Sequence, residues 1–282
     1  MSPTKPSSTQ STGAPARATA NWSALIPLYF RSLSFLTGMV LSIPPFALIS
    51  LLIYPLPFPL RYRLISQWAR LNLWWLQMTC RLTYDVQGSE NIPQTNSIVF
   101  CKHQSAWETL ALQRIFPPQV WVLKRELLWI PLFGWGLAVL QPIAIDRKSG
   151  RKAIHDVLSQ GRERLAAGRW VIVFPEGTRV APWEQRRYGI GGALLAERTG
   201  FPVVPVAHNA GEFWPRRGFL KKPGVIKVRV GPPIAATGRR AQEINALAQR
   251  WIEQQMTEIS APRRTANPPH GTIRENAYKP DG

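Results

Sequence analysis

Two residues with complementary acid–base chemistry follow a short apolar run near residue 100. His103 is followed five positions later by Glu108. The run Ser97–Phe100 is typical of a buried strand, and a helix is expected to begin near Ala106. On a regular helix, a separation of five residues places two side chains about 140° apart. His103 and Glu108 therefore meet only if the histidine lies in the strand-to-helix turn and the glutamate in the first helical turn.

A histidine in such a pair is suited to act as a general base. A carboxylate that accepts a hydrogen bond from one imidazole nitrogen fixes the tautomer, and it leaves the other nitrogen free to take a proton. The same two residue types also meet at a helix start by chance. His103 and Glu108 alone do not distinguish these two interpretations.

The most specific string in the chain is FPEGTR, Phe174–Arg179, which ends a predicted strand over Trp170–Phe174. Its proline ends the strand, and Gly177 allows a tight turn. Glu176 and Arg179 are then projected from one short loop. An arginine held in this way can bind a phosphate group bidentately, and the glutamate can orient it or bond a hydroxyl group.

A second basic cluster follows the predicted strand Pro142–Ile145. It contains four cations close to a helix start, namely Arg147, Lys148, Arg151 and Lys152. Helix N-termini and arginine side chains both favour phosphate. A solvated basic loop is the alternative, because the whole chain is strongly basic.

Other candidate residues are weaker. The predicted strand Val203–Ala207 contains Pro205, which indicates a sheet edge or an opening in the ladder, as at the wall of a cleft. His208 could line that cleft, but a structural or solvent-facing role is favoured. Cys101 precedes His103 by two residues, yet it falls within an apolar strand and is expected in the core rather than as a nucleophile. The His-x4-Glu spacing does not match a zinc motif.

Short apolar runs alternate with helical patterns from residue 81 onward, which predicts an α/β domain with a largely parallel or mixed sheet. In such sheets, reactive groups collect at the carboxyl ends of the strands. The expected strands are Leu82–Val86, Ser97–Lys102, Val120–Leu123, Pro142–Ile145, Trp170–Phe174, Val203–Ala207 and Ile226–Val230. The expected helices of this domain are Ala106–Ile115, Leu132–Leu140, Arg151–Ala167, Gly192–Arg198 and Ala241–Ile259.

The N-terminal part of the chain indicates membrane attachment. No charged residue occurs in Ser32–Leu60, and Leu33–Tyr54 is long and apolar enough to span a bilayer. Pro44 and Pro45 are expected to kink or break a helix, so a re-entrant hairpin is an alternative to a single span, and a buried helical hairpin is a third. The Trp-rich segment Leu64–Met78 fits either an interfacial helix or a helix packed on the domain.

These patterns divide the chain into four parts. Residues 1–21 and 261–282 are expected to be disordered, residues 22–80 to anchor the protein to a membrane, and residues 81–260 to form the α/β domain. No secretory signal is expected.

The composition of the chain narrows the classes of partner. The 282 residues include 35 basic and 16 acidic side chains, a net charge of +19, which favours an anionic partner. Nucleic acid would explain this charge, but it would not explain the uncharged N-terminal stretch or FPEGTR, and no nucleic-acid-binding module is recognisable. The 12 Trp are typical of a membrane–water interface. Cys80 and Cys101 are expected to be reduced thiols in a cytosol-facing domain.

The ordered motifs resemble the 1-acylglycerol-3-phosphate (lysophosphatidic acid) acyltransferase family over roughly residues 60–240. That family carries a His-x4-Asp block, a block ending in arginine, an FPEGTR block and an apolar block centred on proline. The corresponding stretches here are Lys102–Glu108, Gln141–Arg147, Phe174–Arg179 and Val203–Val206. The resemblance implies the glycerolipid acyltransferase fold, an α/β sheet flanked by helices with an N-terminal membrane-associated helical segment.

The resemblance also implies a reaction. His103 would take the proton from the free sn-2 hydroxyl of 1-acyl-glycerol-3-phosphate as that oxygen attacks an acyl thioester, giving phosphatidic acid. Glu108 would stabilise the imidazolium, and no cofactor, metal or covalent acyl-enzyme is implied. The residues implied in binding the acceptor phosphate are Arg147, Glu176, Gly177, Thr178 and Arg179.

The chain departs from the family pattern at two positions: Glu108 stands where the family usually has Asp, and Lys102 where Asn is frequent. The longer glutamate can make the same hydrogen bond, but it leaves the subfamily open. An acceptor such as a lyso-ornithine lipid or another lysophospholipid is therefore an alternative, and a non-enzymatic basic membrane-binding protein is a third interpretation.

The resemblance further implies partners and a location. We expect membrane phospholipids, a lysophospholipid acceptor and a donor that is acyl-CoA or acyl carrier protein, and no nucleic acid. The expected location is a bacterial-type inner membrane with the catalytic domain facing the cytoplasm.

Overall fold

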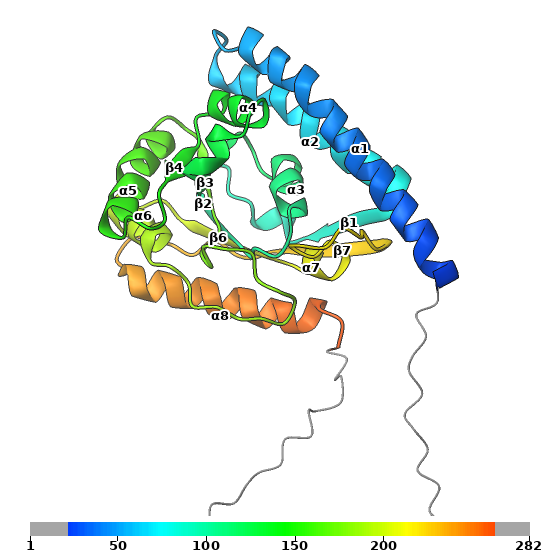
Figure 1. Ribbon diagram of the computed structural model, residues 1–282. Helices are drawn as coiled ribbons and strands as arrows, with labels where there is room; N and C mark the ends of the chain where they lie inside the picture. The colour runs from blue at the N-terminus through cyan, green and yellow to red at the C-terminus, as the bar shows by residue number, and fades with distance from the viewer. Residues whose placement is uncertain (1–21, 263–282) are drawn as a thin grey trace, which may run out of the picture.

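The computed structural model describes residues 22–262, which form one twisted sheet with helices on both faces (Figure 1). The strand order is β1-β7-β6-β2-β5-β3-β4, and every neighbouring pair is parallel except β6 and β7. The predicted α/β class with a mixed, largely parallel sheet is confirmed.

The strands are β1 (Leu82–Gln87), β2 (Ile98–Cys101), β3 (Gln119–Lys124), β4 (Ile143–Ile145), β5 (Trp170–Val173), β6 (Val203–His208) and β7 (Gly224–Val230). The α-helices are α1 (Trp22–Leu52), α2 (Phe58–Cys80), α3 (Trp107–Ile115), α4 (Phe133–Val139), α5 (Arg151–Ala166), α6 (Gly191–Thr199), α7 (Ala210–Phe213) and α8 (Ala241–Ile259). Two 3₁₀ turns are η1 (Ser89–Asn91) and η2 (Arg125–Trp129).

The central strands are apolar because helices cover both of their faces. All residues of β2 and β5 are buried, as expected for parallel strands in an α/β sheet. Helices α5, α6 and α8 lie on one face, and α2 and α3 lie on the other (Figure 1). Because β2, β5, β4 and β6 are parallel in this sheet, the loops that follow them meet at one edge.

The position of Pro205 corrects one expectation. Its strand, β6, lies inside the sheet between β7 and β2, so the predicted sheet edge is wrong. Pro205 is tolerated because pairing with β7 covers only Val206–His208, and the proline carbonyl accepts a hydrogen bond from the Gly231 N–H at 2.8 Å. The N–H group that Pro205 lacks would therefore lie where the β6–β7 ladder has already ended, so no hydrogen bond of that ladder is lost.

Helix α1 is continuous through Pro44 and Pro45, so the expected break at these residues does not occur. Contacts with α2 and α4 hold the helix in place. On α2, the indole nitrogens of Trp75 and Trp68 donate to the Ser34 carbonyl at 3.1 Å and to the Ser42 hydroxyl at 2.9 Å. Both hydrogen bonds tie the part of α1 that precedes the prolines to α2, and contacts with α2 and α4 pack against the helix.

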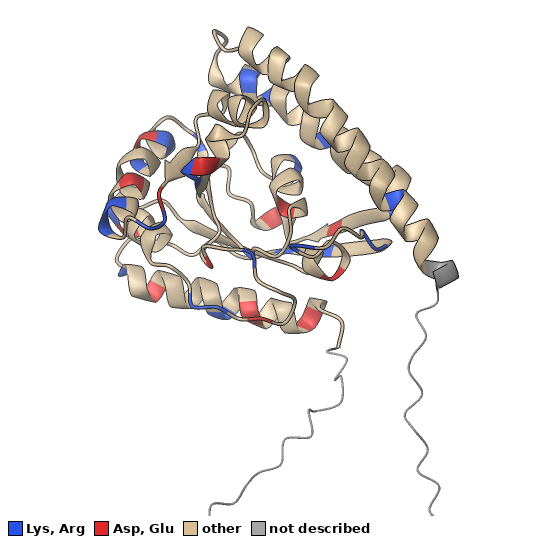
Figure 2. Ribbon diagram, viewed as in Figure 1, with Lys and Arg blue, Asp and Glu red and all other residues tan. Residues whose placement is uncertain are grey.

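The outer surface of α1 is apolar. By length and composition its residues Leu25–Leu52 could cross a membrane, and most of these side chains are not buried by the rest of the protein. Lys, Arg, Asp and Glu residues are concentrated on the α/β domain and are sparse on α1 (Figure 2). The Trp-rich helix α2 combines the two predicted roles, because Trp68 and Trp75 face α1 while Trp74 is exposed.

Candidate active site

His103 and Glu108 meet in the way that their spacing requires. His103 lies in the turn after β2, and Glu108 is in the first turn of α3. The imidazole Nδ1 is 2.8 Å from Glu108 Oε1. The carboxylate is fully buried, whereas the histidine side chain is 10% exposed. The ring therefore has one side fixed by the protein and another that is accessible.

Glu108 also organises the turn that carries the histidine. Its Oε1 accepts hydrogen bonds from the backbone N–H groups of Gln104, at 3.0 Å, and Ser105, at 2.8 Å. Burial by itself raises the pKa of the Glu108 carboxyl, but the His103 hydrogen bond, the positive charges that His208 and His103 carry when protonated and the Ser105 N–H outweigh burial and hold that pKa below its ordinary value. The carboxylate is thus ionised, and it also benefits from the dipole at the start of α3.

The tautomer of His103 follows from this geometry. Because Nδ1 faces an ionised carboxylate, it carries the hydrogen, and Nε2 is left as an acceptor. The ring of Phe174 stacks on the imidazole with a centroid separation of 4.1 Å and an interplanar angle of 17°. This stacking restrains the ring in the orientation that the hydrogen bond sets. Phe174 is part of the site. The sequence indicated no role for this residue, although it opens the FPEGTR string.

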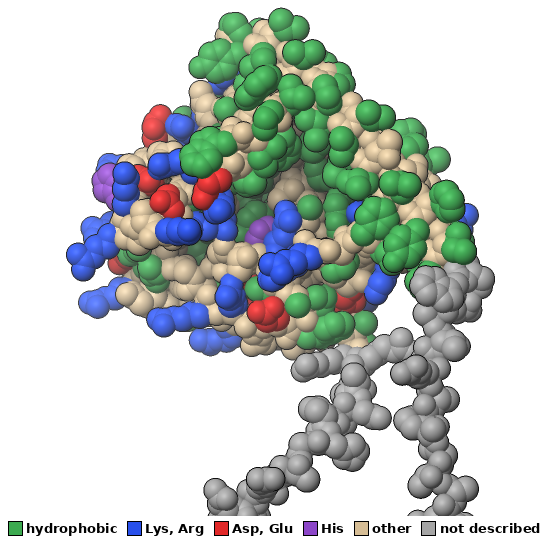
Figure 3. All heavy atoms as spheres, in the orientation of Figure 1, with side chains coloured by type: hydrophobic (Ala, Val, Ile, Leu, Met, Phe, Trp, Pro, Cys, Tyr) green, Lys and Arg blue, Asp and Glu red, His purple; other side chains and the backbone are tan. Residues whose placement is uncertain are grey.

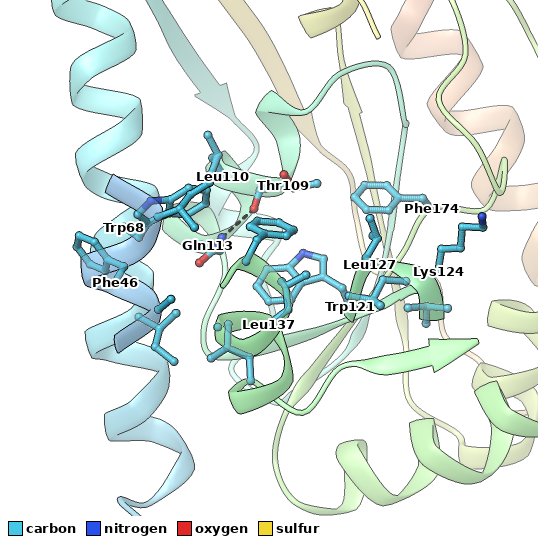
Figure 4. Close-up of a pocket in the computed structure, with 18 of the residues that line it drawn as sticks. Phe46, Trp68, Thr109, Leu110, Gln113, Trp121, Lys124, Leu127, Leu137 and Phe174 are labelled. Carbon is cyan, nitrogen blue, oxygen red and sulfur yellow. Dashed lines mark hydrogen bonds between the residues drawn. The ribbon is translucent and has the colours of Figure 1, made fainter. Parts of the chain in front are cut away.

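An apolar pocket of about 280 Å³ begins at His103. Figure 4 shows Phe174 and Lys124 at one side of this pocket and Phe46 and Trp68, from α1 and α2, at the other. Most of its lining is hydrophobic, contributed by α1, α2, α3, β3 and α4; examples are Phe46, Ile65, Trp68, Leu110, Trp121 and Leu137. A chain of methylene groups bound here would be removed from water along its length.

Two arginines lie beside His103 in the pocket lining: Arg147 from the loop after β4 and Arg179 from the loop after β5. Arg147 donates a hydrogen bond to the Gly177 carbonyl, which connects these two loops. The Nε of Arg179 is buried and has no hydrogen-bond partner among residues 22–262. Figure 3 shows a histidine and basic side chains together below a hollow lined by hydrophobic groups. An anion at this place would satisfy the free Arg179 donor.

Glu176 points into the protein instead of the pocket. Its Oε1 lies 2.7 Å from Lys102 Nζ, and its Oε2 accepts a hydrogen bond from the His103 N–H at 2.7 Å. Gly177 has a φ of 69°, in the left-handed region that favours glycine. Glu176, Gly177 and Thr178 do not line the described pocket. Direct contact of these three residues with a phosphate stays a prediction, and in this structure they shape the loop that carries Arg179.

His208 is buried behind the His103–Glu108 pair. Its Nδ1 accepts a hydrogen bond from the Ala210 N–H, so its Nε2 carries the hydrogen and donates to the Lys102 carbonyl at 2.7 Å. Burial lowers the pKa of His208 despite the charge of Glu108, whose Oε2 is 4.0 Å away. This neutral histidine does not line the pocket; the solvent-facing role is wrong for it, and the structural role fits.

The remaining candidates do not join the site. Burial raises the pKa of the Cys101 thiol well above its ordinary value, so this residue is a core thiol and not a nucleophile. Lys148, Arg151 and Lys152 are not part of the pocket lining. Within the described residues, no group of three or more His, Cys, Asp or Glu side chains is placed to hold a metal ion.

Comparison with known proteins agrees with this geometry. The family model described as Acyltransferase matches residues 83–209, a segment that contains His103, Glu108, Arg147 and Arg179. The 1-acyl-sn-glycerol-3-phosphate acyltransferase of Pseudomonas aeruginosa is 43% identical over 222 residues, which cover 77% of this chain and 86% of that protein. The chain belongs to the 1-acyl-sn-glycerol-3-phosphate acyltransferase family. It is an acyltransferase, and the resemblance of its four ordered motifs to this family is confirmed.

More distant members of the acyltransferase family extend the match. The human 1-acyl-sn-glycerol-3-phosphate acyltransferase alpha is 29% identical over 201 residues, which cover 69% of this chain and 71% of that protein. The crystal structure of the 1-acyl-sn-glycerophosphate (LPA) acyltransferase PlsC from Thermotoga maritima superposes with a TM-score of 0.70 at 22% identity, covering 84% of this chain and 98% of that one. At this identity the superposition shows the shared fold.

Proposed function

We propose that this acyltransferase transfers a fatty acyl group from an acyl thioester to the free sn-2 hydroxyl of 1-acyl-glycerol-3-phosphate, giving phosphatidic acid for phospholipid synthesis. One observation carries the proposal: a carboxylate-held histidine opens into an apolar pocket and lies beside two arginines, one with a free buried donor. These three parts suit a hydroxyl group, an acyl chain and a phosphate.

In the proposed reaction, His103 Nε2 takes the proton of the acceptor hydroxyl as that oxygen attacks the thioester carbonyl. A C–O bond forms, the C–S bond breaks, and the imidazolium returns the proton to the leaving thiolate. Glu108 stays ionised throughout, and it stabilises the imidazolium through the 2.8 Å contact with Nδ1. The protein needs no covalent intermediate for this transfer.

The apolar pocket is assigned to a fatty acyl chain. Its lining joins the catalytic edge of the sheet to α1 and α2, the helices with the exposed apolar surface. A lipid bound there passes from His103 toward the part of the protein that we place in the bilayer. The acceptor and product then never need to leave an apolar environment completely.

We place the protein in a bacterial-type inner membrane with its catalytic domain on the cytoplasmic side. The exposed apolar surface of α1 and the P. aeruginosa relative support this location. The net charge of +19 suits anionic lipids and either donor, the phosphates of coenzyme A or an acidic acyl carrier protein.

Inverted membrane vesicles should use added acyl thioesters without detergent. Activity only in right-side-out vesicles would contradict the cytoplasmic orientation of the catalytic domain.

An assay of the purified full-length protein tests the proposed substrates. We expect wild type to acylate lysophosphatidic acid and to discriminate against 1-acylglycerol, which lacks the phosphate. Acyl-CoA and acyl carrier protein donors are compared in parallel, because both fit the site. A lyso-ornithine lipid or another lysophospholipid is compared in direct competition with lysophosphatidic acid. If the protein prefers one of them, that lipid is the acceptor. No transfer to any of these acceptors would reject the proposal.

Arg179→Ala should raise the KM for lysophosphatidic acid. Loss of a charge-assisted hydrogen bond costs about 1.5–3 kcal/mol, which corresponds to about a 10- to 100-fold weaker acceptor interaction. Discrimination between lysophosphatidic acid and 1-acylglycerol should shrink by the same factor. Initial-rate kinetics at saturating donor measure both quantities.

The matched control is Arg186→Ala, because Arg186 is an exposed arginine that follows in the same connection between β5 and α6 and does not line the pocket. Its kinetics should stay close to those of wild type. If Arg179→Ala lowers kcat with no change in KM, its role in ground-state binding is wrong.

A further inference from the structure

Lys102 directly precedes the catalytic histidine, yet it is one of the most buried side chains, with 1% of its surface exposed. Its ammonium group contacts three segments that are far apart in the sequence. Nζ lies 2.7 Å from Glu176 Oε1 and 2.8 Å from Glu253 Oε1 of α8, and it donates to the Glu184 carbonyl at 3.3 Å. One buried cation thus connects the loop after β2, the loop after β5 and helix α8.

Glu176 transmits this contact to the active site. Its other oxygen, Oε2, accepts the His103 N–H at 2.7 Å, while the His103 carbonyl accepts the Val180 N–H at 2.8 Å. The backbone of His103 is therefore held on both sides by the loop after β5. Arg179 lies in that loop between the two contacts. A shift of Glu176 would move both the base and the arginine.

The charges in this cluster do not balance, because two carboxylates share one ammonium group. Burial raises the pKa of Glu176 to about 7; Lys102 and the His103 N–H oppose the increase, and the charge of Glu253 adds to it. The Tyr188 hydroxyl, 3.4 Å from Glu253 Oε1, also faces the cluster. Burial raises the pKa of Tyr188 far above its ordinary value, so this group stays neutral.

The core thiol of Cys101, whose pKa is raised by burial, is neutral as well. Among the described groups packed around Glu176, Lys102 is therefore the cation that favours its ionised form. Glu253 competes for the same cation. Opposite effects on Glu176 are expected when these two neighbours are removed.

We propose that Lys102 is a positioning residue for acyl transfer: through its buried contacts with Glu176 and Glu253 it anchors Glu176, so that Glu176 fixes the His103 backbone and the loop carrying Arg179. This inference rests on the proposed function, because the reaction it supports is the acylation assigned above.

Lys102→Met keeps the length of the side chain and removes its charge. We expect kcat/KM to fall about 10- to 100-fold, since small displacements of catalytic groups have costs of this size. Activity needs the ionised form of Glu176 as well as an unprotonated His103, so the pKa of Glu176 contributes to the loss of activity as the pH falls. Without Lys102 that pKa rises, and the acid limb of the kcat/KM profile should move to higher pH.

Glu253→Gln is expected to move the acid limb in the opposite direction, to lower pH, because it removes a negative charge next to Glu176. Glu243→Gln, on the same helix but in an exposed pair with Arg239, is the matched control and should leave the profile unchanged. A loss of helix packing alone would not shift the two profiles in opposite directions. If Lys102→Met does not yield folded protein by circular dichroism, the direction of the Glu253→Gln shift decides the question.

A double-mutant cycle isolates the path through Glu176. If Lys102 acts through this carboxylate, Lys102→Met should cost much less in a Glu176→Gln background than in wild type. Equal losses in both backgrounds, or unshifted acid limbs in both single variants, would overturn the inference. Failure of the proposed function is distinct, because wild type itself would then not acylate lysophosphatidic acid.

Discussion

Replacing His103 by alanine is expected to lower kcat/KM for acyl transfer by about 10²- to 10⁴-fold, the usual contribution of a general base. The substitution removes the only group in the pocket lining that can take a proton at neutral pH, since Arg147, Arg179 and Lys124 are cations. The fold should survive, because Glu108 keeps two backbone donors, the N–H groups of Gln104 and Ser105. Steady-state kinetics with lysophosphatidic acid measure the loss.

His155→Ala is the matched control for this experiment. The side chain of His155 lies on α5 and is 79% exposed, so its removal should leave the rate and the thermal unfolding temperature unchanged. Retention of a tenth or more of wild-type activity by His103→Ala, with the same circular dichroism spectrum, would show that His103 is not the base. The interpretation as a non-enzymatic membrane-binding protein also requires that activity in cells survives this substitution.

The alternation of apolar runs with helical patterns was sufficient to predict the fold class and the individual strands. Strand β2 and helix α3, for example, lie within one residue of their expected bounds. The sheet order was not predictable, because it depends on long-range pairing that local patterns do not encode. Pro205 shows the difference: a proline in a strand indicates a gap in the ladder, but only the three-dimensional pairing reveals that this gap lies inside the sheet.

Membrane attachment illustrates the same limit. The uncharged N-terminal stretch predicts a long apolar helix, and α1 has that character. Pro44 and Pro45 favour a break when local propensity alone is considered. Contacts from α2, which begins only at Phe58, override that propensity, and α1 stays continuous.

For the active site, the sequence predicted the pairing of His103 with Glu108 and the place of both arginines at one edge of the sheet. It did not predict the direction of Glu176 or the burial of Lys102. A lysine and a glutamate in loops are usually solvated, and no spacing rule places a cation next to carboxylates that are 74 or more residues away. The charge of Glu253 lies next to Lys102 only in the folded protein, where α8 packs against the loop after β2.

Glu108→Gln is the second substitution with a large expected effect, a loss of about 10²- to 10³-fold in kcat. In a serine protease triad, replacing the aspartate by asparagine costs about 10⁴-fold because the histidine adopts the wrong tautomer. Here three donors converge on Glu108 Oε1, so the amide oxygen of glutamine should occupy that place and preserve the tautomer. The substitution removes only the charge that stabilises the imidazolium. The loss of kcat should therefore be smaller than in the serine protease triad. A rise in KM for either substrate, with kcat unchanged, would contradict this assignment.

Glu108→Asp tests whether the active site needs the charge of this residue, the length of its side chain, or both. The aspartate keeps the negative charge but is shorter by one methylene group, so on this backbone it cannot hold His103 Nδ1, Gln104 N and Ser105 N with one oxygen as Glu108 does. We expect about a 10-fold loss of kcat, which is between wild type and Glu108→Gln, because misplacement costs less than the charge. Wild-type activity in Glu108→Asp would show that the turn relaxes to accept the shorter carboxylate. A loss as large as that of Glu108→Gln would show that this active site needs the length of glutamate as much as its charge.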